Sequence, residues 1–298
     1  MTQEHAVAAA FAQTKYPTAR EQNPCSSQLP PIPTTQAAMR ELTRGRIVRQ
    51  HRGAGESAGA GADLLLANDT LAKLLIDVTA NVHEGYAARD LNRADIRARV
   101  ITASEFVNHS SNQHGHALTL PAINLPDAKP RGILTIAQAR MGRRVIVDAI
   151  QGYLGSEARS VTVQVGSGQV VAYWMVPTLR VQWPAGGSLR KFVRTLLRSF
   201  DAVTGTRLSE QRRGSFHRDE PDVQAALCAL GVAANLGLLI VERINTRDAT
   251  SSSASTLWDT LGQFTRTTGI PILCMATPGA AAPGITGPLH HYEFAAPW

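Results

Sequence analysis

Hydrophobic and polar positions follow two patterns along the second half of the chain. Continuous apolar runs, typical of strands buried on both faces, occur at Gly132–Ala137, Gly237–Val241 and Ile270–Met275. Apolar residues at helical spacing predict helices over Gly142–Leu154, Leu189–Val203, Asp222–Leu236 and Ser253–Thr268. Strands that alternate with helices of this length indicate an α/β domain with a parallel sheet covered on both faces, a three-layer arrangement.

A period-two pattern predicts a β-hairpin between the first two of these helices. The runs Val161–Val165 and Val170–Val176 flank Gly166-Ser167-Gly168, which is a turn signal. We expect Leu179–Trp183 to extend this hairpin. Ser188 is a good N-cap for the helix that follows.

The first half of the chain predicts an extended arm and a helical region. Leu29–Pro33 should be extended, because proline disfavours helix at and before itself. Gly53–Asp63 is a flexible linker by composition. Helical spacing predicts one helix that starts near Leu64 and ends at Gly85, and a second over Asn92–Phe106. The resulting division is an arm with a basic, Gly-rich linker (1–63), a helical region (64–124) and an α/β domain (125–298).

Charge and cysteine content narrow the class of protein. Lys and Arg number 30 against 23 Asp and Glu, a net charge of +7, which fits binding to DNA and fits a solvated basic surface equally well. Cys25, Cys228 and Cys274 are far apart, so neither a zinc site nor a disulfide is predicted, and a reducing cytoplasm is the expected compartment. The last two lie in apolar runs and should be core. No apolar run reaches the roughly 18 residues of a membrane span, and the N-terminus is unlike a signal peptide.

The remaining polar clusters predict no catalytic or metal site. His109, His114 and His116 fall in an irregular segment that a plain loop explains. His290-His291 lie near an end expected to be loose. Surface or capping roles are expected for four acids without a partner at useful spacing, Glu84, Asp90, Asp148 and Asp201. Trp174 and Trp183 flank the strand pair and should pack rather than stack on bases.

The turn after Gly132–Ala137 stands where a phosphate-binding loop would stand. Such a loop needs Gly-x-x-x-x-Gly-Lys-Ser/Thr, whose backbone N–H groups and Lys hold phosphates and whose hydroxyl holds Mg²⁺. Ala137–Arg144 reads AQARMGRR, and Gly142 alone matches. The turn by itself is therefore no motif.

Seven short segments, in order from Asn23 to Pro278, nevertheless form a set. They are Asn23–Ile32 (NP-x4-LPPI), Gly85–Asp90 (GY-x-x-R), Arg131–Leu134, Val176–Val181 with Pro184, Gly187 and Ser188, Phe200–Thr206, Gly237–Asn245, and Gly269–Pro271 with Met275–Pro278. In this order they resemble the TniB/TnsC-type regulators of transposition. Those proteins are P-loop ATPases of the AAA+ class that assemble on DNA and couple target choice to a transposase.

The resemblance implies a nucleotide site whose chemistry is altered here. Arg143 occupies the P-loop Lys position, Arg144 the Mg²⁺ hydroxyl position and Thr277 the polar sensor position; the Walker B pair is Glu242-Arg243. Arg is no equivalent of Lys, Arg144 cannot ligate a metal, and Arg243 cannot polarise the attacking water. ATP hydrolysis is expected to be impaired or lost. Binding of Mg-ATP without hydrolysis, and a collapsed loop with solvated arginines, both stay open. The helical lid of AAA+ ATPases is not expected.

The resemblance also implies partners. Arg190, Arg194 and Arg198 are four apart, so they lie along one helix face. Two interpretations of this face stay open: a solvated basic surface, and a surface that binds the DNA backbone. The full set of phosphate-contact candidates is Arg190, Lys191, Arg194, Arg198, Arg212 and Arg213. A proline-fixed strip loses little entropy on binding, so the arm is the predicted partner-docking segment through Asn23, Pro24, Leu29, Pro30, Pro31 and Ile32.

The function expected from the sequence is thus a DNA-binding regulator of target selection. Its partners would be the duplex backbone, a transposase and an oligomer of itself or a paralogue, with no membrane. Two alternatives stay open: a pseudo-ATPase adaptor that caps or poisons assemblies of an intact paralogue, and a decayed remnant without function.

Overall fold

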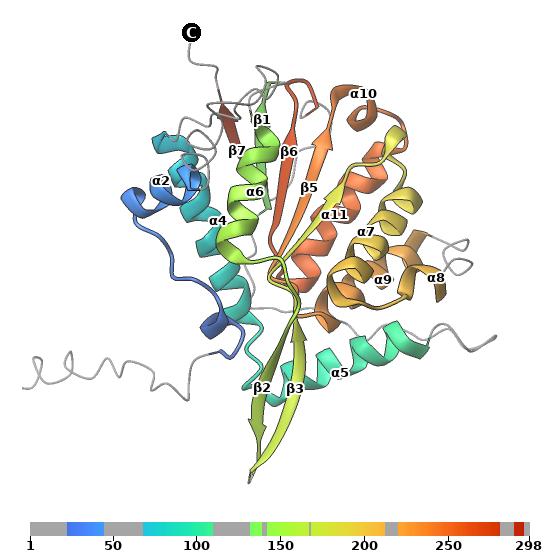
Figure 1. Ribbon diagram of the computed structural model, residues 1–298. Coiled ribbons are helices and arrows are strands. Elements are labelled where there is room, and N and C mark those ends of the chain that lie inside the picture. The colour runs from blue at the N-terminus through green and yellow to red at the C-terminus, as the bar shows by residue number, and fades with distance from the viewer. Residues whose placement is uncertain are drawn as a thin grey trace, which may run out of the picture.

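The computed structural model describes residues 23–44, 68–109, 132–138, 142–166, 168–211, 220–280 and 289–294. Its centre is a sheet with the strand order β4-β5-β6-β1-β7, in which every neighbouring pair is parallel (Figure 1). These strands are β1 (Gly132–Ala137), β4 (Thr178–Gln182), β5 (Leu238–Ile244), β6 (Ile272–Ala276) and β7 (Leu289–Phe294). A separate antiparallel hairpin consists of β2 (Arg159–Val165) and β3 (Gln169–Met175). The predicted α/β fold with a parallel sheet is confirmed.

The helices of the described residues connect and cover these strands. They are α2 (Thr35–Thr43), α4 (Asp69–Ala88), α5 (Ala94–His109), α6 (Arg143–Leu154), α7 (Leu189–Thr204), α8 (Leu208–Gln211), α9 (Glu220–Ala233), α10 (Thr246–Ala249) and α11 (Ala254–Thr268), with the 3₁₀ turns η1 (Ser26–Gln28) and η2 (Ala185–Gly187). None of them combines the length and the apolar character that would cross a bilayer.

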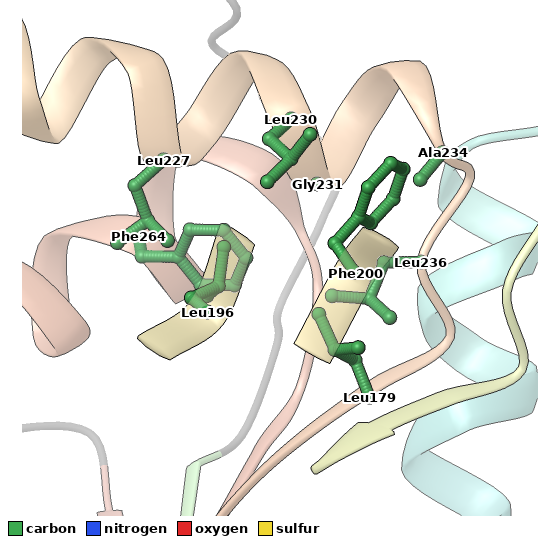
Figure 2. Close-up of a pocket in the computed structure, with 9 residues that line it drawn as sticks. All are labelled: Leu179, Leu196, Phe200, Leu227, Leu230, Gly231, Ala234, Leu236 and Phe264. Carbon is green, nitrogen blue, oxygen red and sulfur yellow. The ribbon is translucent and has the colours of Figure 1, made fainter. Parts of the chain in front are cut away.

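Alternate side chains of β4 show that the sheet is covered on both faces. Thr178 and Arg180 contact α6 through Gln151. Leu179, one residue out of phase with them, lies on the other face among side chains of α7, α9 and α11 (Figure 2). The cavity between those helices measures ≈ 10 Å³, about the size of one water, and its lining is apolar. It is a packing gap rather than a ligand site.

Two predictions about chain path are wrong. β4 does not extend the hairpin, because the chain leaves it at Val176, whose N–H and C=O bond to Ala234 and Gly237, and β4 then pairs with β5. Gly85 does not end α4, which continues to Ala88. A Cβ on Gly85 would lie 2.9 Å from the Gly269 carbonyl oxygen, so this glycine permits close packing against the segment before β6.

Most of the predicted core and capping residues have the predicted role, with exceptions. Cys228 and Cys274 are buried, as predicted, and so is Cys25. Trp183 packs on Trp258 with ring centroids 4.6 Å apart. Trp174 is 55% exposed, so the prediction that it packs is wrong. α7 begins after Ser188 as predicted, although the Ser188 side chain makes no capping hydrogen bond.

Both ends of the described chain are more ordered than their composition indicates. The predicted arm and linker region contains α2, which Thr34 caps through the Ala37 N–H and which packs on α4. His290 and His291, expected in a loose end, belong to β7, the strand that pairs with β1. The linker Gly53–Asp63 and the segment with His114 and His116 lie outside the described residues.

Candidate functional site

The carboxyl ends of the parallel strands meet at one edge of the sheet, which we call the carboxyl edge. The connection from β1 leads to β4 at one side of the sheet, whereas β6 connects past β1 to β7 at the other side. The winding direction therefore reverses at the β6–β1 pair, and ligands of open α/β sheets bind outside the carboxyl ends at such a reversal. Gly142 follows β1 here, and Thr277 follows β6.

The start of α6, which follows β1 in the chain, carries the wrong side chains for a loop that binds Mg-ATP. Gly142 is the N-cap of α6 and has a left-handed conformation (φ 69°), which glycine adopts without strain. Arg143 and Arg144 form the first turn of α6, so two cations stand where the helix dipole already places positive charge. Burial lowers the pKa of Arg143, whose Nη1 has no hydrogen-bond partner among the described residues. An anion bound beside Arg143 and Arg144 would offset their positive charge.

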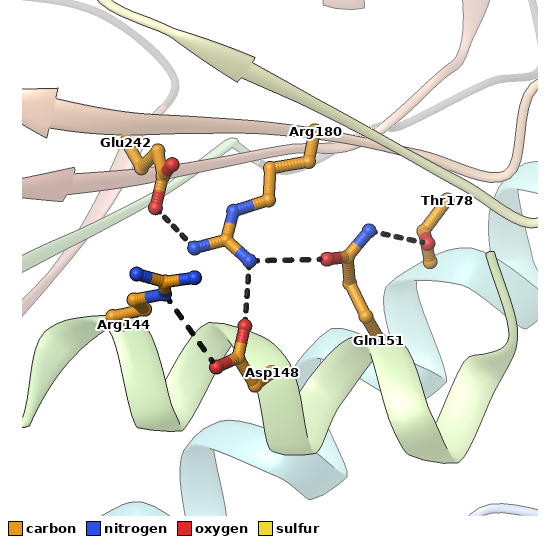
Figure 3. Close-up of polar contacts among 6 residues, drawn as sticks. All are labelled: Arg144, Asp148, Gln151, Thr178, Arg180 and Glu242. Carbon is orange, nitrogen blue, oxygen red and sulfur yellow. Dashed lines mark hydrogen bonds and ion pairs between the residues drawn. The ribbon is translucent and has the colours of Figure 1, made fainter. Parts of the chain in front are cut away.

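Glu242, the predicted Walker B acid, is held by an arginine (Figure 3). The Arg180 Nη2 donates to Glu242 Oε2 at 2.5 Å, from the neighbouring strand β4. Glu242 is 8% exposed, so this carboxylate has little contact with solvent. A bound Mg²⁺ would have to compete with a guanidinium already in place, which makes Glu242 a poor metal ligand.

The same arginine reaches α6. Its Nη1 donates to Asp148 Oδ1 at 2.6 Å and contacts Gln151 Oε1 at 3.4 Å. Arg144 Nε lies 4.0 Å from Asp148 Oδ2. The chain of contacts Arg144–Asp148–Arg180–Glu242 thus joins the loop position to the Walker B position (Figure 3). Asp148 is exposed, as expected of a surface acid, but it has two arginine partners, Arg144 and Arg180.

Electrostatics show that Arg180 is a firm part of this network. Burial alone lowers the pKa of Arg180, but its hydrogen bonds to Glu242 and Asp148 outweigh burial and leave the pKa raised. These two carboxylates therefore favour the charged form of the guanidinium. The network connects β4, β5 and α6.

Arg243 stands apart from the network. It follows Glu242 at a bulge in the β5–β6 ladder, and its φ of 60° is left-handed, which is uncommon for a residue with a Cβ. Its side chain is exposed. Arg243, the second residue of the predicted Walker B pair, therefore presents a cation to solvent at the carboxyl edge.

Thr277 also reaches the carboxyl edge. Its N–H donates to the Ile244 carbonyl at 2.9 Å, and its Oγ1 lies 3.4 Å from the Thr246 Oγ1. Thr246 in turn donates to the Pro278 carbonyl at 2.8 Å. These bonds tie the end of β6 to α10. The structure thus brings all six predicted nucleotide-site and Walker B residues, Gly142, Arg143, Arg144, Glu242, Arg243 and Thr277, to one edge.

The chemistry available at this edge is cationic. Arg143 and Arg144 begin α6, Arg243 is exposed near the end of β5, and Glu242 is already paired. No group of three or more potential metal ligands occurs within the described ranges. The arrangement can attract an anion; among the described residues it offers no free carboxylate at the Walker B position to activate water.

No protein-family model and no curated protein sequence matches this chain.

A second basic surface lies along α7. Arg190, Lys191, Arg194 and Arg198 are exposed, whereas Phe192, Val193 and Phe200 are buried on the opposite side. In the described part of the chain, the three arginines have no ion-pair partner. Lys191 lies close enough to Asp248 to lower the pKa of that carboxyl, after the larger effects of hydrogen bonds from Gly186 and Asn245. Arg212 and Arg213 lie outside the described residues.

The arm lies against its own chain. The Asn23 side-chain amide donates to the Tyr86 carbonyl and, at 3.4 Å, to the Arg89 carbonyl, so it covers the C-terminal end of α4. Tyr153 donates to the Pro31 carbonyl at 2.6 Å, and His83 Nε2 bonds to the Pro30 carbonyl at 2.9 Å.

Only part of the arm remains open to another molecule. Asn23 and Leu29 are buried, Pro24 and Pro30 are half-buried, and Pro31 and Ile32 are exposed, Ile32 to 49%. The arm thus has an inner side that binds α4 and an outer side at Pro31-Ile32. Docking of a partner there stays a prediction.

Arg180 is the site residue that sequence reasoning missed. It stands inside the segment Val176–Val181, where its apolar neighbours mark a strand. A charged residue within such a run indicates a buried partner, but the partner Glu242 lies 62 positions away. Nothing in the spacing identifies which acid it is.

Proposed function

We propose that this protein is a DNA-binding regulator of the TniB/TnsC type that associates with a transposase and does not hydrolyse ATP. The observation that carries the proposal is the exposed arginine row of α7. Arg190, Arg194 and Arg198 share a face, and in the described part of the chain none is neutralised by an acid. Unpaired cations in a row suit a phosphate backbone and contribute affinity without sequence preference.

The arm supports the family part of the proposal. Two of the ordered segments, Asn23–Ile32 and Gly85–Asp90, are far apart in sequence but contact each other through Asn23, Tyr86 and Arg89. Unrelated short matches would have no reason to meet in space. Their contact favours a common origin with proteins that carry both segments.

The absence of hydrolysis is inferred from the ion pair at Glu242. Arg180 occupies the carboxylate that would hold Mg²⁺, and Arg243 replaces the carboxylate that would orient water. We therefore infer that two steps of phosphoryl transfer, stabilisation of charge by Mg²⁺ and orientation of the attacking water, lack the groups that they need. The cationic carboxyl edge is still suited to bind an anion such as ATP without Mg²⁺.

A salt titration of DNA binding tests the proposal. Anisotropy of a labelled random duplex should give a Kd that weakens steeply with salt, and Arg190→Gln/Arg194→Gln/Arg198→Gln should reduce the slope of log K against log salt by about 2.7, that is about 0.9 per phosphate contact. Arg40→Gln/Arg207→Gln/Arg266→Gln removes the same charge from exposed positions on other segments and serves as the control. If both variants lose the same slope, overall positive charge rather than α7 accounts for the binding. A Kd that does not depend on salt would exclude binding to the phosphate backbone.

ATP turnover and ATP binding are separated by two further measurements. We expect no phosphate release above background with or without duplex. A thermal melt with ATP alone, compared with Mg-ATP, should show any stabilisation in the absence of Mg²⁺. Hydrolysis that Glu242→Gln abolishes would refute the inference from the ion pair.

A further inference from the structure

The turn before α7 is held at both backbone polar groups of Gly186. The Gly186 N–H donates to Asp248 Oδ1 at 2.8 Å. The Gly186 carbonyl accepts hydrogen bonds from the Ser251 hydroxyl, at 2.8 Å, and from the Ser253 hydroxyl. All three partners belong to α10 or to the segment that follows it, and α10 lies at the carboxyl edge of the sheet (Figure 1). These bonds tie the start of α7 to α10.

The next residue leaves no room for this turn to shift. A Cβ on Gly187 would lie 2.6 Å from the Ala254 Cβ and 2.9 Å from the Asp248 carbonyl oxygen. Gly187 also has a left-handed backbone (φ 65°), which glycine adopts without strain. The turn therefore packs directly on α10 and on the start of α11. Since α7 begins two residues later, at Leu189, this packing fixes where α7 begins.

Asp248 is held in place by its own helix. Asn245 caps α10: its Oδ1 accepts from the Asp248 N–H at 2.9 Å, and its Nδ2 donates to Asp248 Oδ2 at 2.7 Å. Hydrogen bonds from Gly186 and Asn245 lower the pKa of the Asp248 carboxyl, and the nearby Arg247 and Lys191 cations lower it further. Asp248 is therefore ionised at neutral pH. One of its oxygens bonds within α10, and the other bonds to the turn before α7.

These bonds place a cation of α10 beside the basic face of α7. Lys191 belongs to that face, because it stands three residues before Arg194 and seven before Arg198. Lys191 and Arg247 both act on the Asp248 carboxylate, so both lie near it. Arg247 is exposed and, within the described ranges, forms no ion pair. The basic surface of α7 therefore continues onto α10 at Arg247.

The position of Arg247 suits a phosphate backbone. A helix rises about 1.5 Å per residue, so Arg190 and Arg198 are about 12 Å apart along α7. α10 adjoins the turn before α7, so Arg247 extends the cationic surface at that end. Asp248 is an acid among these cations and repels phosphate, so its presence needs another reason. Its hydrogen bond to the Gly186 N–H supplies one.

We propose that Arg247 is a further contact to the phosphate backbone of duplex DNA, and that Asp248 is a positioning residue that holds α10 and α7 as one binding surface. The proposal rests on the function proposed above, in which α7 binds the duplex. It adds a second element to that surface and assigns a role to an acid within it.

Arg247→Gln in the salt titration of duplex binding tests the contact. Loss of one phosphate contact should reduce the slope of log K against log salt by about 0.9. Arg266→Gln is the matched control, because Arg266 is an exposed cation in the last turn of α11, and it should leave the slope unchanged. A slope that Arg247→Gln does not reduce, or reduces only as much as Arg266→Gln, would overturn the contact.

Asp248→Ala tests the positioning role by the sign of its effect. Removal of a negative charge beside a phosphate would tighten binding, whereas release of the turn before α7 weakens it. We expect the Kd for the duplex to rise by at least about threefold at fixed salt. Tighter binding by Asp248→Ala would overturn the positioning role.

A second variant tests the same role without a change of charge. Ser251→Ala/Ser253→Ala removes the two hydrogen bonds to the Gly186 carbonyl and should also raise the Kd. Ser255→Ala is its control, because the Ser255 hydroxyl bonds to the Ser252 carbonyl and not to the turn, and it should leave the Kd unchanged. If the double variant binds the duplex as the wild type does, the turn does not position α7.

Two outcomes separate a failure at α10 from a failure of DNA binding as a whole. A wild-type Kd that does not depend on salt would exclude backbone binding altogether, at α7 and at Arg247. If the triple variant of α7 loses slope as expected but Arg247→Gln does not, α7 binds DNA without α10, and only the contact at Arg247 is wrong.

Discussion

The Arg180 guanidinium donates to the Glu242 carboxylate at 2.5 Å and to the Asp148 carboxylate at 2.6 Å. One cation therefore joins two strands and a helix at the carboxyl edge of the sheet. This contact is structural. It explains how the fold tolerates a buried acid at the end of β5 without a metal ion.

Removal of Arg180 should destabilise the protein. Arg180→Met should lower the free energy of unfolding by about 2 kcal/mol, because it leaves Glu242 buried and unpaired. Arg180→Met/Glu242→Gln should recover at least half of the loss. Urea unfolding followed by circular dichroism measures both.

Arg144→Met is the control for Arg180. Arg144 shares Asp148 with Arg180, but at 4.0 Å and with a side chain that is 79% exposed. It should cost less than about 0.5 kcal/mol. If both single variants lose equal stability, the contact with Glu242 is not the source of the effect.

Asp201 should make the free energy of unfolding depend on pH at the acidic end. Burial by itself raises the pKa of this carboxyl, but hydrogen bonds from Ser209, Thr206 and Leu208 outweigh burial and leave the pKa below the usual 3.8. A lowered pKa in the folded state stabilises the protein above 3.8, and the benefit is lost as pH falls through the lowered value. Asp201→Asn should thus be less stable than wild type at pH 7 but converge with it below pH 3.8. Urea midpoints across this range measure the difference; a constant gap would contradict the assignment.

The cysteines should report whether the arm is docked. Burial raises the pKa of Cys25, Cys228 and Cys274 to about 12, so the folded protein should resist iodoacetamide at pH 8 and the unfolded chain should react at all three. Asn23→Ala removes the bond to the end of α4 and should accelerate labelling of Cys25 alone. Peptide mass spectrometry identifies the site. Labelling of Cys228 or Cys274 at the same rate would mean global unfolding instead.

Two helical glycines should respond in opposite directions to alanine. A Cβ at Gly152 in α6 meets no atom within 4 Å, so Gly152→Ala should stabilise by about 1 kcal/mol through helix propensity. A Cβ at Gly85 in α4 would lie 2.9 Å from the Gly269 carbonyl oxygen, so Gly85→Ala should destabilise by about 1–3 kcal/mol. Thermal melts of the two variants make the comparison. Stabilisation by both would show that α4 does not pack closely on that segment.

The sequence predicted most of the parallel sheet because its strands are continuous apolar runs. It failed at β7, since Leu289–Phe294 mixes two histidines and a glutamate with apolar residues. It assigned β4 to the wrong sheet, because neighbouring strands in sequence usually pair and the exit at Val176 leaves no local signal. The resemblance predicts Gly142, Glu242 and Thr277 as site residues, and the structure brings all three to the carboxyl edge. Arg180 was missed, since its partners come together only in three dimensions.

The position of β1 has a consequence for synthesis of the protein. β1 is the first strand of the sheet to leave the ribosome, yet Ile133 pairs with Leu273 of β6 on one side and with His290 of β7 on the other, the last two strands made. The six-residue run GILTIA therefore has both edges unpaired while residues 138–271 are translated. An apolar strand in that state is a site for aggregation, and pairing over such distances is slow. We expect expression of soluble protein to depend on chaperones that bind β1 until its two late neighbours arrive.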